Sequence, residues 1–129
     1  MGTIIAFSPR EVAGGTIAPR GLCRALVRDP YLVVLDVRGM REFFSGAAGR
    51  LPMAINVPLA LLAACIRDLR SLRKRRMVLV CANGTHAMQA AAQLRSAGFE
   101  DVAALRGGME LWARLGYPRQ LPPISRTAA

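Results

Sequence analysis

The stretch VLVCANGTHAMQAAAQL, residues 78–94, places Cys81 where a short apolar run ends, three residues before a glycine. A helical pattern of small residues begins just beyond it, near His86. Cysteine is common in cores as a packing residue, but a thiol at the carboxyl end of a strand can also be a nucleophile. Inward-turned N–H groups of the following loop, together with a helix N-terminus, would favour the thiolate form. That loop comprises Ala82, Asn83, Gly84 and Thr85.

Three apolar runs indicate the sheet that must position this loop. They cover residues 31–37, 77–81 and 101–105, and the first ends near Asp36. Runs with so little alternation are typical of strands covered on both faces, as in parallel sheets. The chain is 129 residues long and 53% hydrophobic, which suffices for the core of one domain.

Helical patterns lie between these runs. One follows Pro58 and extends to Leu69, and a second ends before Gly98. A third carries Leu111, Trp112 and Leu115 on one face, with Trp112 expected in the core, and an earlier one contains Leu22, Leu26 and Val27. Alternating strands and helices predict a three-layer α/β/α fold with a central, mostly parallel sheet of about five strands.

The domain is expected to begin near Thr16 and to end near Pro118. Two segments at the start resemble a strand followed by a proline at a helix's first turn, and only the second leads into a helix. Residues 1–15 are therefore predicted to be an N-terminal extension and residues 16–118 the domain. Residues 119–129 contain adjacent prolines and little apolar surface, so they are predicted to form a loose tail.

Composition argues against several classes of protein. The three cysteines form neither a disulfide framework nor a Cys/His metal-ligand pattern, so no metal site is expected and a reducing compartment fits best. No apolar run approaches the roughly 18 residues that span a bilayer, and the start lacks a secretory signal. We therefore expect a cytoplasmic protein without a membrane partner.

The formal charge of +10 raises the question of a nucleic-acid partner. The basic residues are scattered, however, and aromatics make up only 5% of the chain, too few for a stacking platform. The one dense cluster, residues 73–76, is predicted to be a solvated turn between a helix and a strand. No nucleic-acid binding is expected.

Four ordered segments carry a family resemblance over residues 16–118. VVLDVRGMREF contains a strand ending in Asp-x-Arg and a nearby Glu-aromatic pair, and GRLPMAINVPL follows it. VLVCANGTHA then contains the Cys-x-x-Gly loop, and GFEDVAALRGGMELWARLGYP ends the series with Gly-Gly, a helix and Gly-Tyr-Pro. In this order the segments resemble the rhodanese-like sulfurtransferase domain in its single-domain form.

The resemblance implies roles for particular residues. Cys81 matches the sulfur-carrying cysteine, and residues 82–86, ending at His86, match the loop whose amides surround the bound sulfur. Asp36, Arg38 and Glu42 match positions that hold loops near the site. The implied chemistry needs neither a metal nor an organic cofactor. Cys23 and Cys65 fall in helical patterns and are predicted to be packing residues.

Three departures from the family pattern concern the site. His86 replaces a frequent loop arginine, Arg50 and Met53 replace the usual His and Gly, and the segment FSGAAG inserts about three residues. The first affects the expected affinity for substrate, and the other two affect loop geometry.

The resemblance implies transfer of sulfur from a small anionic donor such as thiosulfate to cyanide or a thiol, through a persulfide on Cys81. The sequence leaves open whether a partner protein takes the sulfur. An alternative is a binding, regulatory or sulfur-carrier module with little turnover. A phosphatase of the Cys-x5-Arg type is disfavoured, because the sixth residue after Cys81 is Ala87 rather than the arginine that clamps phosphate.

Overall fold

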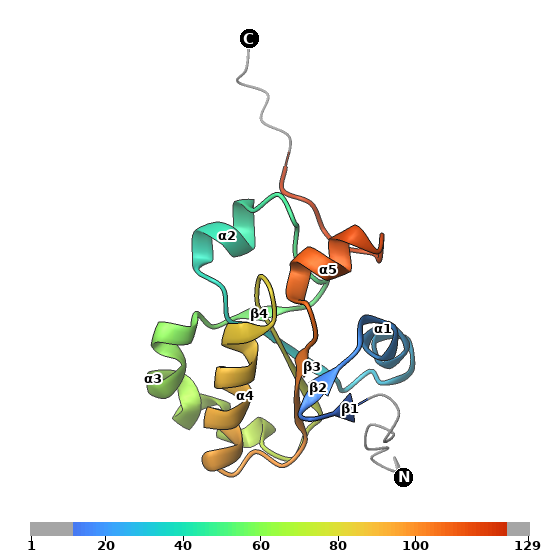
Figure 1. Ribbon diagram of the computed structural model, residues 1–129. Helices are drawn as coiled ribbons and strands as arrows, with labels where there is room; N and C mark the ends of the chain where they lie inside the picture. The colour runs from blue at the N-terminus through green and yellow to red at the C-terminus, as the bar shows by residue number, and fades with distance from the viewer. Residues whose placement is uncertain (1–11, 124–129) are drawn as a thin grey trace.

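The computed structural model describes residues 12–123, which contain a six-stranded sheet (Figure 1). Its strand order is β1-β2-β6-β5-β3-β4, and all neighbouring pairs are parallel except β1 with β2. The strands are β1 (Val12–Ala13), β2 (Thr16–Ile17), β3 (Val33–Asp36), β4 (Ile55–Asn56), β5 (Met77–Val80) and β6 (Val102–Leu105).

Helices cover both faces of the sheet (Figure 1). They are α1 (Pro19–Arg28), α2 (Met40–Ser45), α3 (Leu59–Leu69), α4 (Thr85–Ser96) and α5 (Gly108–Arg114), with a 3-10 turn, η1 (Arg70–Leu72). Helices α3 and α4 pack on one face and α1 and α5 on the other, so the predicted three-layer, mostly parallel fold is confirmed. Among residues 12–123 no helix is long and apolar enough to cross a membrane.

The central strands form the core because each contributes side chains to both faces. In β5, Leu79 joins the cluster beneath α3 and α4, whereas Val78 and Val80 join the cluster beneath α1 and α5. Every residue of β3, β5 and β6 is buried. The uninterrupted apolar runs in the sequence reflect this two-sided burial.

The sheet has one strand more than predicted and begins earlier in the chain. Val12 and Ala13 form an edge strand before Thr16, joined to β2 by a turn at Gly14 and Gly15, both with positive φ. At the other end, Gln120 pairs with Arg50 in an isolated antiparallel bridge beyond Pro118. The remainder of the expected extension (1–11) and tail (124–129) lies outside the described residues.

Two predictions about which residues are buried and which are exposed were wrong. Val27 and Leu115 are exposed, at 84% and 54%, although their helical patterns suggested inward positions. Arg76, the last residue of the basic cluster, is buried rather than solvated. Its guanidinium lies 3.6 Å from an oxygen of Asp29 and 3.5 Å from one of Asp101, so two carboxylates balance the buried charge.

Met53 lies in an unfavourable backbone conformation in the loop before β4. Among residues 12–123 it is the one residue other than glycine with positive φ, at 64°, and its side chain is 93% exposed. A left-handed conformation brings Cβ close to the backbone, which is the reason such positions favour glycine. This geometry suits the glycine that is usual at this position in the family that the sequence resembles.

We therefore expect Met53→Gly to raise the free energy of unfolding by about 1 kcal/mol, measured by urea denaturation. Met53→Ala is the control, because it removes the exposed side chain but keeps Cβ in the strained conformation. The control should change stability by less than about half of that amount. Equal gains in both variants would mean that the side chain, not the backbone, is the source of strain.

Candidate active site

Cys81 follows β5 directly at the carboxyl edge of the sheet, and its side chain is only 2% exposed. Two backbone amides point at its sulfur. The N–H of Gly84 donates to Sγ with a nitrogen-to-sulfur distance of 3.0 Å, and the N–H of Ala87 does so at 3.3 Å. Ala87 lies in the first turn of α4, so the sulfur is contacted by both the loop and the helix N-terminus.

Gly84 gives the loop its tight turn. Its φ of 100° is left-handed, and a Cβ there would lie 3.2 Å from the nitrogen of Gly107 and 3.3 Å from the oxygen of Leu105. The side-chain oxygen of Asn83 accepts the N–H of Thr85 at 3.0 Å, which fixes the turn before α4. The loop thus needs glycine for both conformation and space.

The start of α5 holds the other side of this loop. The N–H of Met109 donates to the carbonyl oxygen of Cys81 at 2.9 Å, and that of Glu110 donates to the oxygen of Ala82 at 3.0 Å. A Cβ on Gly108, whose φ is 60°, would collide with the backbone of both loop residues. These contacts orient the carbonyls of Cys81 and Ala82 toward α5.

Asp36 and Arg38 form a buried ion pair at the end of the neighbouring strand β3. The shortest of their contacts, between Nη2 of Arg38 and Oδ2 of Asp36, is 2.8 Å, and both side chains are nearly fully buried. The same Nη2 donates to the carbonyl oxygen of Gly49 at 2.9 Å, and Asn56 donates to the backbone oxygens of both residues. The pair therefore ties together the segments after β3 and before β4.

The remaining predicted residues differ in their surroundings. Ala82 is half-buried, whereas Asn83, Thr85 and His86 are exposed. His86 is the second residue of α4, and its side chain makes no hydrogen bond or ion pair with residues 12–123. The side chain of Glu42 is exposed on α2 and makes no hydrogen bond or ion pair with residues 12–123, while its backbone oxygen accepts the N–H of Gly46.

The structure brings the predicted loop to one side of Cys81 but adds groups that the sequence did not indicate. Ala87 lies one residue beyond the predicted loop, and its amide nevertheless contacts the sulfur. Sequence reasoning also missed the contacts of Met109 and Glu110, although the Gly-Gly pair before them was a usable signal for close backbone approach.

Cys23 and Cys65 lie on α1 and α3, outside the loop that surrounds Cys81. Both are half-buried, Cys23 on α1 against the core beneath α1 and α5, and Cys65 on α3 against the opposite core. Packing is therefore the role that their positions support. Among residues 12–123, no three His, Cys, Asp or Glu side chains are grouped as metal ligands would be.

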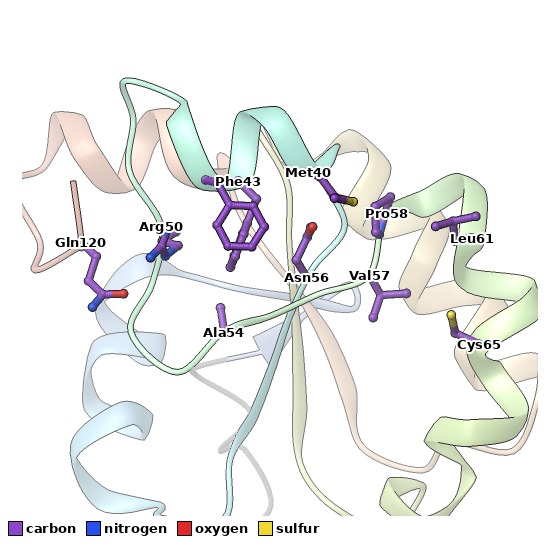
Figure 2. Close-up of a pocket in the computed structure, with 11 residues that line it drawn as sticks. Met40, Phe43, Arg50, Ala54, Asn56, Val57, Pro58, Leu61, Cys65 and Gln120 are labelled. Carbon is purple, nitrogen blue, oxygen red and sulfur yellow. The ribbon is translucent and has the colours of Figure 1, made fainter. Parts of the chain in front are cut away.

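A pocket of about 560 Å³ opens between α2, β4 and α3 (Figure 2). Cys81 is not among the residues that line it. Its lining consists of Met40, Phe43, Phe44, Arg50, Ala54, Asn56, Val57, Pro58, Leu61, Cys65 and Gln120. The sequence did not indicate this pocket, because its walls come from segments up to 80 residues apart.

The cradle around Cys81 suits negative charge on sulfur. Two N–H donors face Sγ within 3.3 Å, and a thiolate or a persulfide anion gains from such donors while a neutral thiol gains less. Burial at the end of a parallel strand keeps competing water away. The fold and this loop together define the class of protein. It is an α/β domain whose candidate site is a single cysteine sulfur that accepts hydrogen bonds from backbone N–H groups.

Comparisons with known proteins agree with this class. A family profile described as "Rhodanese-like domain" matches residues 21–115. A protein named "Sulfurtransferase" from Allochromatium vinosum is 32% identical over 106 residues, covering 82% of this chain and 94% of that protein. "Thiosulfate sulfurtransferase GlpE" from Pseudomonas fluorescens is 36% identical over 97 residues, covering 74% of this chain and 82% of that protein.

Solved structures show the same fold. The solution structure of the rhodanese-like domain of the Anabaena sp. Alr3790 protein superposes with a TM-score of 0.70 at 28% identity, covering 91% of this chain and 86% of that chain. A rhodanese-related protein from Thermoplasma volcanium gives a TM-score of 0.69 at 26% identity, covering 80% of this chain and 94% of that chain. The chain belongs to the rhodanese-like domain family, and its relatives support a sulfurtransferase of that type.

Substitution of Gly108 should show whether α5 holds the loop. We expect Gly108→Ala to lower the free energy of unfolding by at least about 2 kcal/mol and to slow loading of Cys81 with sulfur, because its Cβ would push the loop carbonyls away. Gly116→Ala is the matched control, since Gly116 has φ of 76° but open space around it. It should cost about 1 kcal/mol through backbone strain alone and leave loading unchanged. Equal effects of the two variants would contradict a holding role for α5.

Proposed function

We propose that this protein is a sulfurtransferase that moves sulfane sulfur from a small anionic donor such as thiosulfate to cyanide or a thiol. A persulfide on Cys81 is the intermediate. The observation that carries the proposal is the pair of amides, from Gly84 and Ala87, directed at a buried Sγ. The names of the relatives from Allochromatium and Pseudomonas support the same reaction class.

In the first half-reaction the Cys81 thiolate attacks the outer sulfur of thiosulfate. A new S–S bond forms to Cys81 as the bond between the two thiosulfate sulfurs breaks, and its electron pair leaves with sulfite. The negative charge then lies on the outer sulfur of the persulfide. Amides at the loop and at the start of α4 stabilise this charge without a metal or organic cofactor.

In the second half-reaction a nucleophilic acceptor attacks the outer sulfur. With cyanide the products are thiocyanate and the Cys81 thiolate, so the enzyme returns to its starting state. With a thiolate acceptor, of a small molecule or a partner protein, the product is a new persulfide. Two half-reactions through one covalent intermediate predict ping-pong kinetics.

The remaining predicted residues position the loops around this site. Asp36 and Arg38 hold the segment that follows β3. Asp36 is the last residue of β3 and pairs with Val80, which directly precedes Cys81. Glu42, in the first turn of α2, is assigned to this group by its match to the family pattern alone, because its exposed side chain makes no hydrogen bond or ion pair with residues 12–123. A cytoplasmic location is part of this proposal, because a cysteine that cycles through a persulfide needs a reducing compartment to stay free.

A second candidate is a binding or sulfur-carrier module with little turnover. The exposed His86, in place of an arginine at the loop, favours it, because the loop then offers a donor anion less fixed charge. Sulfur uptake without multiple turnovers would distinguish this function from catalysis.

Intact-mass measurement tests the role of Cys81. After incubation with thiosulfate, we expect the protein to gain the mass of one sulfur atom, and cyanide should remove it. Cys81→Ala should fold, because the change removes one small buried group, and should gain nothing. Sulfur uptake by the folded Cys81→Ala variant would contradict the assignment of Cys81 as the sulfur carrier.

Cys23→Ala and Cys65→Ala are the matched controls for this experiment. Each residue is half-buried, so each change should cost about 1 kcal/mol of stability through lost packing. The rate of sulfur transfer should stay within a few-fold of the original, as expected for residues that do not contact the reacting atoms. If either folded variant lost transfer, a relay through a second thiol would replace the single-cysteine mechanism.

His86→Arg tests the departure from the family at the loop. The change adds a permanent charge in the first turn of α4, so we expect KM for thiosulfate to fall on the order of ten-fold with little change in kcat. The gain should shrink as ionic strength rises. Gln89→Arg adds the same charge one turn farther along α4 and should give a smaller gain. Equal gains would mean that net charge, not contact at the loop, matters.

A further inference from the structure

The pocket between α2, β4 and α3 has a distinct chemical character. Its walls are mainly apolar, with Phe43 and Met40 from α2 on one side and Leu61 from α3 on the other (Figure 2). Its volume of about 560 Å³ lies within the range of small-molecule sites. Only Arg50, Asn56 and Gln120 bring polar side chains to it, and such a combination is typical of sites for ligands with one polar group.

Arg50 is held rigidly in the wall of this pocket. Its backbone exchanges two hydrogen bonds with Gln120, at 2.9 and 2.8 Å. Its guanidinium carbon lies 5.2 Å from the ring centre of Phe43 and 5.3 Å from that of Phe44. Two aromatic rings and a bridged backbone therefore fix the position of a positive charge that would otherwise move with a flexible side chain.

This charge has no carboxylate partner in the part of the chain that the structure describes. The ion pairs there involve Arg38 and Arg76, and Arg50 takes part in none of them. The aromatic rings attract the cation but supply no acceptor for its N–H groups. An anionic ligand would therefore gain charge-assisted hydrogen bonds from donors that are already in place.

Apolar surface continues from the pocket to solvent. Met40, Phe44 and Leu61 line it and are 61%, 51% and 51% exposed. Large apolar side chains left this open are unusual when they gather in one place, and they gain free energy when a ligand covers them. The gain requires a ligand with an apolar body, so an inorganic anion alone would use only half of the site.

We propose that this pocket binds an organic monoanion with an apolar body. Arg50 bonds the anionic head group, and Met40, Phe43 and Leu61 contact the body. Neither Cys81 nor any residue of its loop, 82–87, lines this pocket. Binding there involves no covalent step, so it is testable whether or not Cys81 transfers sulfur.

A series of ligands, tested on the full chain, separates the contribution of the charged head group from that of the apolar body. The probes are octanoate, acetate with the same head group, and octylammonium with the same body and the opposite charge. We expect octanoate to bind at least about 100-fold more tightly than acetate, because several methylenes leave water. Octylammonium should bind at least about ten-fold more weakly than octanoate. Titration calorimetry gives the affinities, and a rise in Tm with octanoate shows binding to the folded state.

Paired variants locate the binding. Arg50→Gln should weaken octanoate on the order of ten-fold, whereas Arg41→Gln, which removes the same charge from an exposed position on α2 outside the pocket, should have little effect. Leu61→Glu puts a negative charge at the pocket and should abolish binding. Leu115→Glu, at a leucine of similar exposure elsewhere, should not. Equal effects within either pair would overturn the site.

Cys65 provides a reporter inside the pocket. In the Cys81→Ala protein, octanoate should slow alkylation of Cys65 by N-ethylmaleimide, measured by peptide mass, and leave that of Cys23 on α1 unchanged. Slowing of both cysteines would indicate a general effect of octanoate on the fold and would count against the proposal. Octanoate that binds no more tightly than acetate, or no more tightly than octylammonium, would refute it outright. None of these outcomes bears on sulfur loading of Cys81.

Discussion

Two hydrogen bonds from the start of α5 to the carbonyls of Cys81 and Ala82 are the constraint on which the site depends. A peptide unit has its carbonyl and its N–H on opposite sides, so holding these carbonyls against α5 leaves the later amides of the loop free to face the sulfur. Because Gly108 has no Cβ, α5 can approach the backbone of Cys81 and Ala82. Because Gly84 has no Cβ, the loop can make its tight turn. Backbone geometry, rather than a charged side chain, thus creates the environment of the sulfur.

The buried pair of Asp36 and Arg38 gives the adjoining loops a comparable anchor. Removing one partner of such a pair costs about 3 to 5 kcal/mol, because the other charge is left buried. Arg38 also bonds to Gly49, 11 residues along the chain, and Asn56 bonds back to the end of β3. The long connection from β3 to β4 is therefore fixed at several points although it contains only one short helix.

Much of the fold could be predicted because burial on both faces leaves a plain mark in the sequence. The strands β3, β5 and β6 are apolar except for Asp36, and glycines, Gly98 and Gly116, follow α4 and α5 closely. Helix α2 has six residues and no side-chain cap, and β1 and β4 have two residues each, so none of them has a detectable period. Val27 and Leu115 show that an apolar residue near a helix end need not face the core.

The candidate site, like the fold, could be predicted only in part. Cys81 and its loop could be predicted because a strand end, small residues and a helix start are contiguous in sequence. The amide of Ala87 and the contacts of α5 depend on angles that residue types do not encode. The pocket depends on the pairing of Arg50 with Gln120, which are far apart in sequence, and Gln120 lies outside the four family segments.

The pairing of Arg50 with Gln120 also determines where the chain leaves the domain. The last described residues, red in Figure 1, run past α2 and α5 at the carboxyl edge of the sheet. Any segment attached beyond Pro123 is therefore tethered on the side of the sulfur loop and the pocket. A short flexible tether gives an attached domain an effective concentration in the millimolar range near that edge.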